Sequence, residues 1–76
     1  MTGNNRLHGN IARIVVERGF GFISVDNMDY FFHHSSLENA TIKQLILGDP
    51  VSFTVGRNER GLRAEQVTLL RDPFKS

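Results

Sequence analysis

A chain of 76 residues with 39% hydrophobic residues suits one small folded domain and is too apolar for a disordered chain. The absence of cysteine excludes disulfides and thiolate metal sites, and a net charge of +1 does not by itself indicate a nucleic-acid partner. No apolar run reaches the roughly 18 residues of a membrane span, and the polar start lacks the apolar region of a signal peptide. We therefore expect a cytoplasmic protein.

Short segments rich in Val, Ile and Phe, separated by Gly, Asn and Asp, predict an all-β domain. The five predicted strands are residues 7–16, 20–25, 29–33, 51–55 and 62–69. Because closure removes exposed strand edges, we predict a five-stranded antiparallel barrel of the OB-fold type. We place this domain at residues 6–70, with 1–5 and 71–76 as flexible termini.

The longest connection lies between the third and fourth predicted strands. It favours a single helical turn followed by a loop, and a true helix over residues 42–47 is the alternative, because Ile42, Leu45 and Ile46 have helical spacing. Gly48 and Pro50 end any helix there.

The phenylalanines of the second and third predicted strands cannot all be buried, because adjacent strand residues point to opposite faces. The residues that we place inside are Ile23, Val25, Tyr30 and Phe32. The rings that we place outside are those of Phe20, Phe22, Phe31 and His33. Periodicity alone is also compatible with buried phenylalanine pairs, but the core of so short a chain is too small for all six Phe residues. An exposed row of rings with basic neighbours indicates unpaired nucleic-acid bases as the partner.

Alternation in the fourth predicted strand is clear. It predicts that Val51, Phe53 and Val55 face the core and that Ser52 and Thr54 face solvent.

Two motifs, RGFGFI at residues 18–23 and YFFHHS at residues 30–35, resemble the RNA-binding motifs of the bacterial cold-shock domain family. LGDPVSFTV at residues 47–55 and AEQVT at residues 64–68 are similar to the fourth and fifth strands of that family. The resemblance covers about residues 9–70. It implies an OB-fold barrel that binds single-stranded RNA or DNA with little sequence preference and acts as an RNA chaperone.

Carried over by position, the resemblance implies a set of nucleic-acid contacts. The implied stacking residues are Phe20, Phe22, Phe31 and His33, and Arg18 and Arg60 lie near phosphates. His34 is open between an edge contact and a solvated strand end. Arg57 and Arg63 are left open between a phosphate contact and a solvated turn.

The chain also departs from the family pattern. The family usually has lysine, tryptophan and phenylalanine where this chain has Ala12, Arg13 and Ile14, and His34 and Ile42 replace aromatic residues. Arg13 remains a candidate contact, because a guanidinium plane can stack on a base and also meet a phosphate. We therefore expect a weaker and more salt-sensitive binder than is usual for the family.

Other functions receive less support. His33 and His34 do not predict a metal site, because successive strand residues point to opposite sides. GFG lacks the lysine and helix of a phosphate loop, and His34 beside Ser35 lacks the remaining groups of a hydrolase, so we expect no enzyme, no cofactor and no small-molecule substrate. The alternatives to a monomeric cold-shock-type protein are a barrel that binds a protein partner through the same apolar surface and an S1-like RNA-binding domain.

Overall fold

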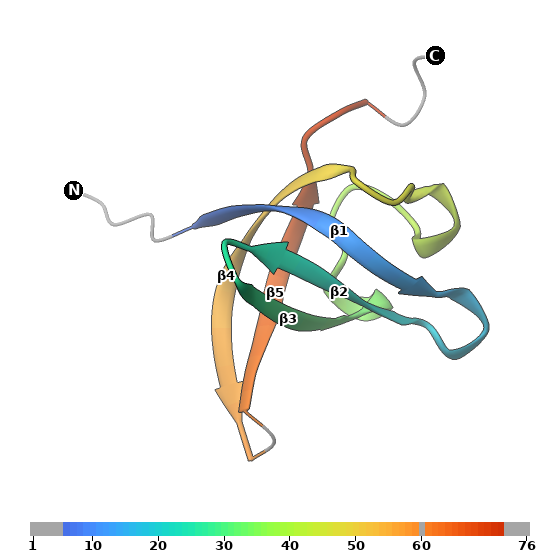
Figure 1. Ribbon diagram of the computed structural model, residues 1–76. Coiled ribbons are helices and arrows are strands. Elements are labelled where there is room, and N and C mark those ends of the chain that lie inside the picture. The colour runs from blue at the N-terminus through green and yellow to red at the C-terminus, as the bar shows by residue number, and fades with distance from the viewer. Residues whose placement is uncertain (1–5, 60, 73–76) are drawn as a thin grey trace.

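The computed structural model describes residues 6–59 and 61–72. Its strands are β1 (Leu7–Val15), β2 (Phe20–Val25), β3 (Met28–His33), β4 (Pro50–Asn58) and β5 (Gly61–Leu69). They form a closed barrel in the order β1-β2-β3-β5-β4 (Figure 1). All five strands were predicted, and the largest difference is that β4 continues three residues beyond its predicted end.

The prediction that every strand pair is antiparallel is wrong for one pair. Four neighbouring pairs are antiparallel, but β3 and β5 run parallel, with Phe31 opposite Arg63. The reason is geometric, because an odd number of strands in a closed ring cannot alternate direction at every position. The all-β barrel therefore has mixed pairing, and the parallel pair joins β3 to β5, between which the long connection and β4 lie in sequence.

The long connection contains single turns. It contains two 3-10 turns, η2 (His34–Ser36) and η3 (Ile42–Gln44), and a third turn, η1 (Val16–Arg18), joins β1 to β2. The alternative of a helix over residues 42–47 is wrong, because η3 ends after one turn and Leu45 already has extended backbone angles. None of the helical turns in the described ranges has the length and apolar character that crossing a membrane requires.

The core fills the inside of the barrel. Its buried apolar residues are Ile11, Ile23, Tyr30, Phe32, Leu45, Val51, Phe53, Ala64, Val67 and Leu69. The inward placement of Ile23, Tyr30 and Phe32 is thereby confirmed, and Val25 is partly buried against this core. The rings of Tyr30 and Phe53 contact each other with centroids 5.2 Å apart.

The alternation predicted for β4 is correct at Val51 and Phe53 and wrong at two other positions. Val55 is 40% exposed, although it lies opposite the fully buried Ala64 in the β4–β5 ladder. Ser52 is buried, because Arg6 covers it and donates hydrogen bonds to its hydroxyl at 3.1 Å and to its carbonyl oxygen at 2.9 Å.

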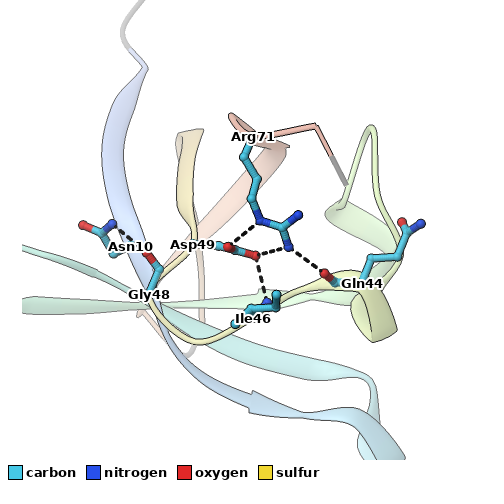
Figure 2. A network of polar contacts seen from close by, with 6 residues as sticks. All are labelled: Asn10, Gln44, Ile46, Gly48, Asp49 and Arg71. Carbon is cyan, nitrogen blue, oxygen red and sulfur yellow. Dashed lines mark hydrogen bonds and ion pairs between the residues drawn. The ribbon is translucent and has the colours of Figure 1, made fainter. Parts of the chain in front are cut away.

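A polar network around Asp49 links the connection between η3 and β4 to Arg71, which follows β5 (Figure 2). Arg71 donates from Nε to Asp49 Oδ1 at 2.7 Å and from Nη2 to Oδ2 at 2.9 Å, and it also donates to the carbonyl of Gln44. The backbone N–H of Ile46 donates to the same carboxylate at 2.8 Å. Ordered contacts thus extend to Arg71, one residue beyond the domain boundary that we predicted from the sequence.

Candidate nucleic-acid interface

The rings of Phe20, Phe22 and Phe31 form an aromatic cluster on the outer wall of β2 and β3. Their centroids are 5.5 to 6.0 Å apart, and all three side chains are half-buried. They face outward because Gly21, Ile23 and Phe32, the alternate residues of the same strands, face the core. The predicted outward placement of the three rings is confirmed.

The aromatic cluster is not a flat surface. The plane of Phe22 is tilted by 89° from that of Phe20 and by 72° from that of Phe31, whereas Phe20 and Phe31 differ by 36°. Edge-to-face contacts stabilise such an arrangement. The faces of the three rings therefore point in different directions. Bases of a single strand could stack on all three rings only if the strand bends or twists.

The glycine on the inner face of β2, Gly21, makes room for a large core side chain. A Cβ atom added at Gly21 would lie 2.7 and 2.8 Å from Cζ and Cε1 of the Phe32 ring. The missing side chain thus leaves the space that Phe32 occupies in the core. Gly19 has a different role, because its φ of +74° ends η1 in a left-handed conformation.

His33 lies opposite Phe20 in the β2–β3 ladder and so shares the face of the aromatic cluster. Its Nδ1 accepts a hydrogen bond from the backbone N–H of Ser35 at 3.2 Å and is 2.9 Å from the Ser35 hydroxyl. Because Nδ1 is an acceptor, the neutral ring carries its proton on Nε2. The ring is therefore fixed in orientation, with an N–H donor on its other side.

The two histidine rings lie together, and the prediction that they point to opposite sides is wrong. Their centroids are 4.3 Å apart, because His34 begins the turn η2 and does not continue the strand. The backbone N–H of His34 donates to the carbonyl of Gly19 at 2.8 Å, and its exposed ring leaves no room for a side chain at Gly19. Over the described part of the chain, no group of three or more His, Cys, Asp or Glu side chains is arranged to hold a metal ion.

Arg13 lies beside the aromatic cluster because β1 contains an extra residue. Ile11 pairs with Ile23, but Arg13 pairs with Phe22, so Ala12 forms a bulge that turns Arg13 outward. Arg13 is exposed and, with Ala12, Phe22 and Asp29, lines a shallow depression of about 310 Å³. The depression combines a guanidinium, an aromatic ring and a carboxylate next to the cluster.

Two further arginines, Arg18 and Arg60, were predicted as contacts, and the structure describes only the first. Arg18 is exposed on η1, directly before Gly19 and the first ring of the aromatic cluster. Arg60 lies outside the described residues.

Arg63 is a residue that sequence reasoning did not assign to the interface. It lies opposite Phe31 in the parallel β3–β5 pair and faces outward beside the aromatic cluster. Arg57 pairs with Leu62, which precedes Arg63 and therefore faces the other side of the hairpin. Alternation around the buried Ala64 indicates that Arg63 points outward, but only the β3–β5 pairing shows that Phe31 is its neighbour.

Comparisons with known proteins agree with this architecture. Residues 7–70 match the family described as the "Cold-shock" DNA-binding domain. Cold shock-like protein CspA of Vibrio cholerae is 39% identical over 69 residues, which cover 88% of this chain and 99% of that protein. Cold shock-like protein CspLB of Listeria monocytogenes is 44% identical over 63 residues, which cover 82% and 96%.

A solved structure described as Drosophila Unr CSD456 aligns with a TM-score of 0.72 and 27% identity. It covers 97% of this chain, and this chain spans 30% of its length. A closed five-stranded barrel with aromatic rings on its outer wall is an architecture of small nucleic-acid-binding domains. The chain belongs to the cold-shock DNA-binding domain family and is a nucleic-acid-binding protein of the cold-shock type.

Proposed function

We propose that this protein binds single-stranded RNA or DNA through the aromatic cluster and acts as an RNA chaperone. The observation that carries the proposal is the position of three phenylalanine rings, 5.5 to 6.0 Å apart, on the outer wall and separate from the buried core. Every base has a flat π-face, so such rings bind unstacked bases without requiring a particular sequence. The protein does this as a cytoplasmic monomer, without catalysis and without a cofactor.

Polar residues complete the proposed interface around the aromatic cluster. His33 and His34 lie at its η2 end, Arg18 at its η1 end and Arg13 beside Phe22. Arg60 is proposed from the family pattern alone. Arginines at the rim bind phosphates, while the rings stack on the bases between them.

The chaperone activity follows from selective binding. A protein that binds unpaired bases and not paired ones stabilises the open form of a hairpin by mass action, without ATP. Since each base that stacks on an aromatic side chain contributes roughly 1–3 kcal/mol, a few stacked bases offset the cost of opening a short stem.

The affinity is expected to depend strongly on salt. About four phosphate contacts on a single strand predict a slope of roughly −3 in a plot of log affinity against log salt concentration. A titration of fluorescent oligo-dT or oligo-U between low and moderate salt measures the slope, and a flat response would contradict the proposal.

The double variant Phe20→Ala, Phe31→Ala tests the aromatic cluster directly. Loss of two stacking rings should weaken binding by roughly 2–6 kcal/mol, which is about thirtyfold or more. The matched control is Val55→Ala, Leu62→Ala, which removes two partly exposed apolar side chains from the hairpin. The proposal is wrong if the folded double variant binds oligo-dT as well as the control does.

A further inference from the structure

One row of four side chains crosses the outer wall of the barrel. The ladders place Arg13 opposite Phe22, Phe22 opposite Phe31, and Phe31 opposite Arg63. Directly opposed residues share one face of a sheet, and neighbouring strands lie about 4.8 Å apart. The row thus carries two rings in its middle and a guanidinium at each end, and it spans roughly 14 Å when followed along the curved wall from β1 to β5.

The two guanidinium groups have different surroundings. Arg13 is exposed, whereas the side chain of Arg63 is only 30% exposed. Its Nε is shielded from solvent and has no hydrogen-bond partner among the residues that the structure describes. The charged atom that approaches it is Oε2 of Glu65, at 3.6 Å, which is an ion-pair distance too long for a hydrogen bond.

Glu65 reaches this position because of Gly56. Gly56 lies opposite Arg63 in the β4–β5 ladder, and the carboxylate of Glu65 occupies the space above it. A Cβ atom on Gly56 would collide with the Cδ and both carboxylate oxygens of Glu65. The absence of a side chain at this position therefore allows the carboxylate to lie beside the guanidinium, while 48% of the Glu65 side chain remains exposed.

We propose that Arg63 binds a phosphate of the nucleic acid and that Glu65 competes with that phosphate for the guanidinium. This inference rests on the proposed function. Arginine binds carboxylate and phosphate with the same set of donors, so one anion replaces the other. Partly exposed ion pairs at this distance are weak, so a phosphate next to Phe31 displaces Glu65 from the guanidinium at little cost. Glu65 thereby lowers the affinity of the free protein without blocking the site.

Two charge-matched comparisons test this inference with fluorescent oligo-dT. Glu65→Gln should tighten binding about two- to fivefold relative to Glu38→Gln, which makes the same change in net charge at an exposed position in the connection after η2. Arg63→Gln should weaken binding about three- to tenfold and make the salt slope shallower by about 0.7, whereas Arg57→Gln, on the other side of the hairpin, should change both less.

A third comparison separates the ion pair from general charge effects. In a protein that already carries Arg63→Gln, Glu65→Gln should have no effect beyond that of Glu38→Gln, because the competition requires both partners. Gly56→Ala moves the Glu65 carboxylate without changing the charge of the protein and should tighten binding in the same direction as Glu65→Gln.

The outcomes distinguish this inference from the proposed function. If the parent protein binds oligo-dT but Glu65→Gln equals Glu38→Gln, or Arg63→Gln equals Arg57→Gln, the inference is wrong and the proposed function stands. If the parent protein does not bind oligo-dT at low salt, both are wrong.

Discussion

Replacing Asp49 with alanine removes the carboxylate that links the connection before β4 to Arg71 (Figure 2). The variant loses two hydrogen bonds from Arg71 and one from the backbone N–H of Ile46. Arg71 is partly exposed and regains water, but the Ile46 N–H is left without its acceptor. Because Asp49 is only 6% exposed, the loss is that of a buried polar contact.

The expected loss in the free energy of unfolding is about 1–3 kcal/mol, the usual consequence of leaving a buried donor unpaired. For a domain of this size, each kcal/mol lowers the melting temperature by about 4–8 °C. None of the contacts of this network involves a ring of the aromatic cluster, so the affinity for oligo-dT, measured well below the melting temperature, should not change.

The same carboxylate predicts how stability depends on pH. The hydrogen bonds from Arg71 hold the pKa of Asp49 below its ordinary value of 3.8, burial opposes this shift, and the Ile46 N–H adds to it. A pKa that is lower in the folded state means that the unfolded chain binds the proton more readily. The contribution of Asp49 is therefore complete above about pH 4 and is lost as the pH falls through the lowered pKa.

Urea unfolding of the parent protein, of Asp49→Ala and of Asp49→Asn between pH 2 and pH 7 measures both effects. The parent should be more stable at pH 7, and the difference should shrink below about pH 4. Glu38→Gln, which makes the same change in net charge at an exposed position, serves as the control for a general effect of charge. Equal stability of the parent and Asp49→Asn at pH 7, or a difference that does not depend on pH, would refute the role assigned to Asp49.

Two further substitutions test the fold. Gly21→Ala should lower the free energy of unfolding by about 1–3 kcal/mol, because its methyl group overlaps the Phe32 ring in the core, and an unchanged urea midpoint would contradict this. Arg6→Gln should lower it by about 1–2 kcal/mol, because the buried Ser52 hydroxyl and its carbonyl oxygen lose their donor, and a loss no greater than that of Arg57→Gln would argue against the contact.

The arrangement of β2 and β3 was predictable from the sequence because these two strands pair without interruption. Their register runs from Phe20 opposite His33 to Val25 opposite Met28 with no extra residue. Alternation therefore assigns every side chain of the pair to the correct face, and the consecutive residues Phe31 and Phe32 require one ring outside. The aromatic cluster, which carries the proposed function, follows from local pattern alone.

The faces of β1 and β5 could not be assigned in this way, because each strand contains a bulge that changes which face the following residues occupy. In β5 the pairing shifts between the partners of Ser52 and Thr54, and Gln66 adopts a φ of +51°. As a result Ala64 and Val67, three residues apart, are both fully buried. No glycine marks the bulge in the sequence, and simple alternation places these two side chains on opposite faces.

The bulge in β1 determines that Arg13 lies on the outer wall, beside the aromatic cluster. Without an extra residue, Ile11 inside would place Ala12 outside and Arg13 inside, where an unpaired guanidinium is strongly disfavoured. With Ala12 as the extra residue, Ile11 stays in the core and Arg13 lies opposite Phe22. An arginine thus stands at the end of a row of aromatic side chains, at a position where the family usually has a tryptophan. Under the proposed function, a guanidinium at this position replaces part of the stacking surface with charge. We therefore expect less of the binding free energy to come from stacking, which is insensitive to salt, and more from phosphate contacts, which weaken as salt rises.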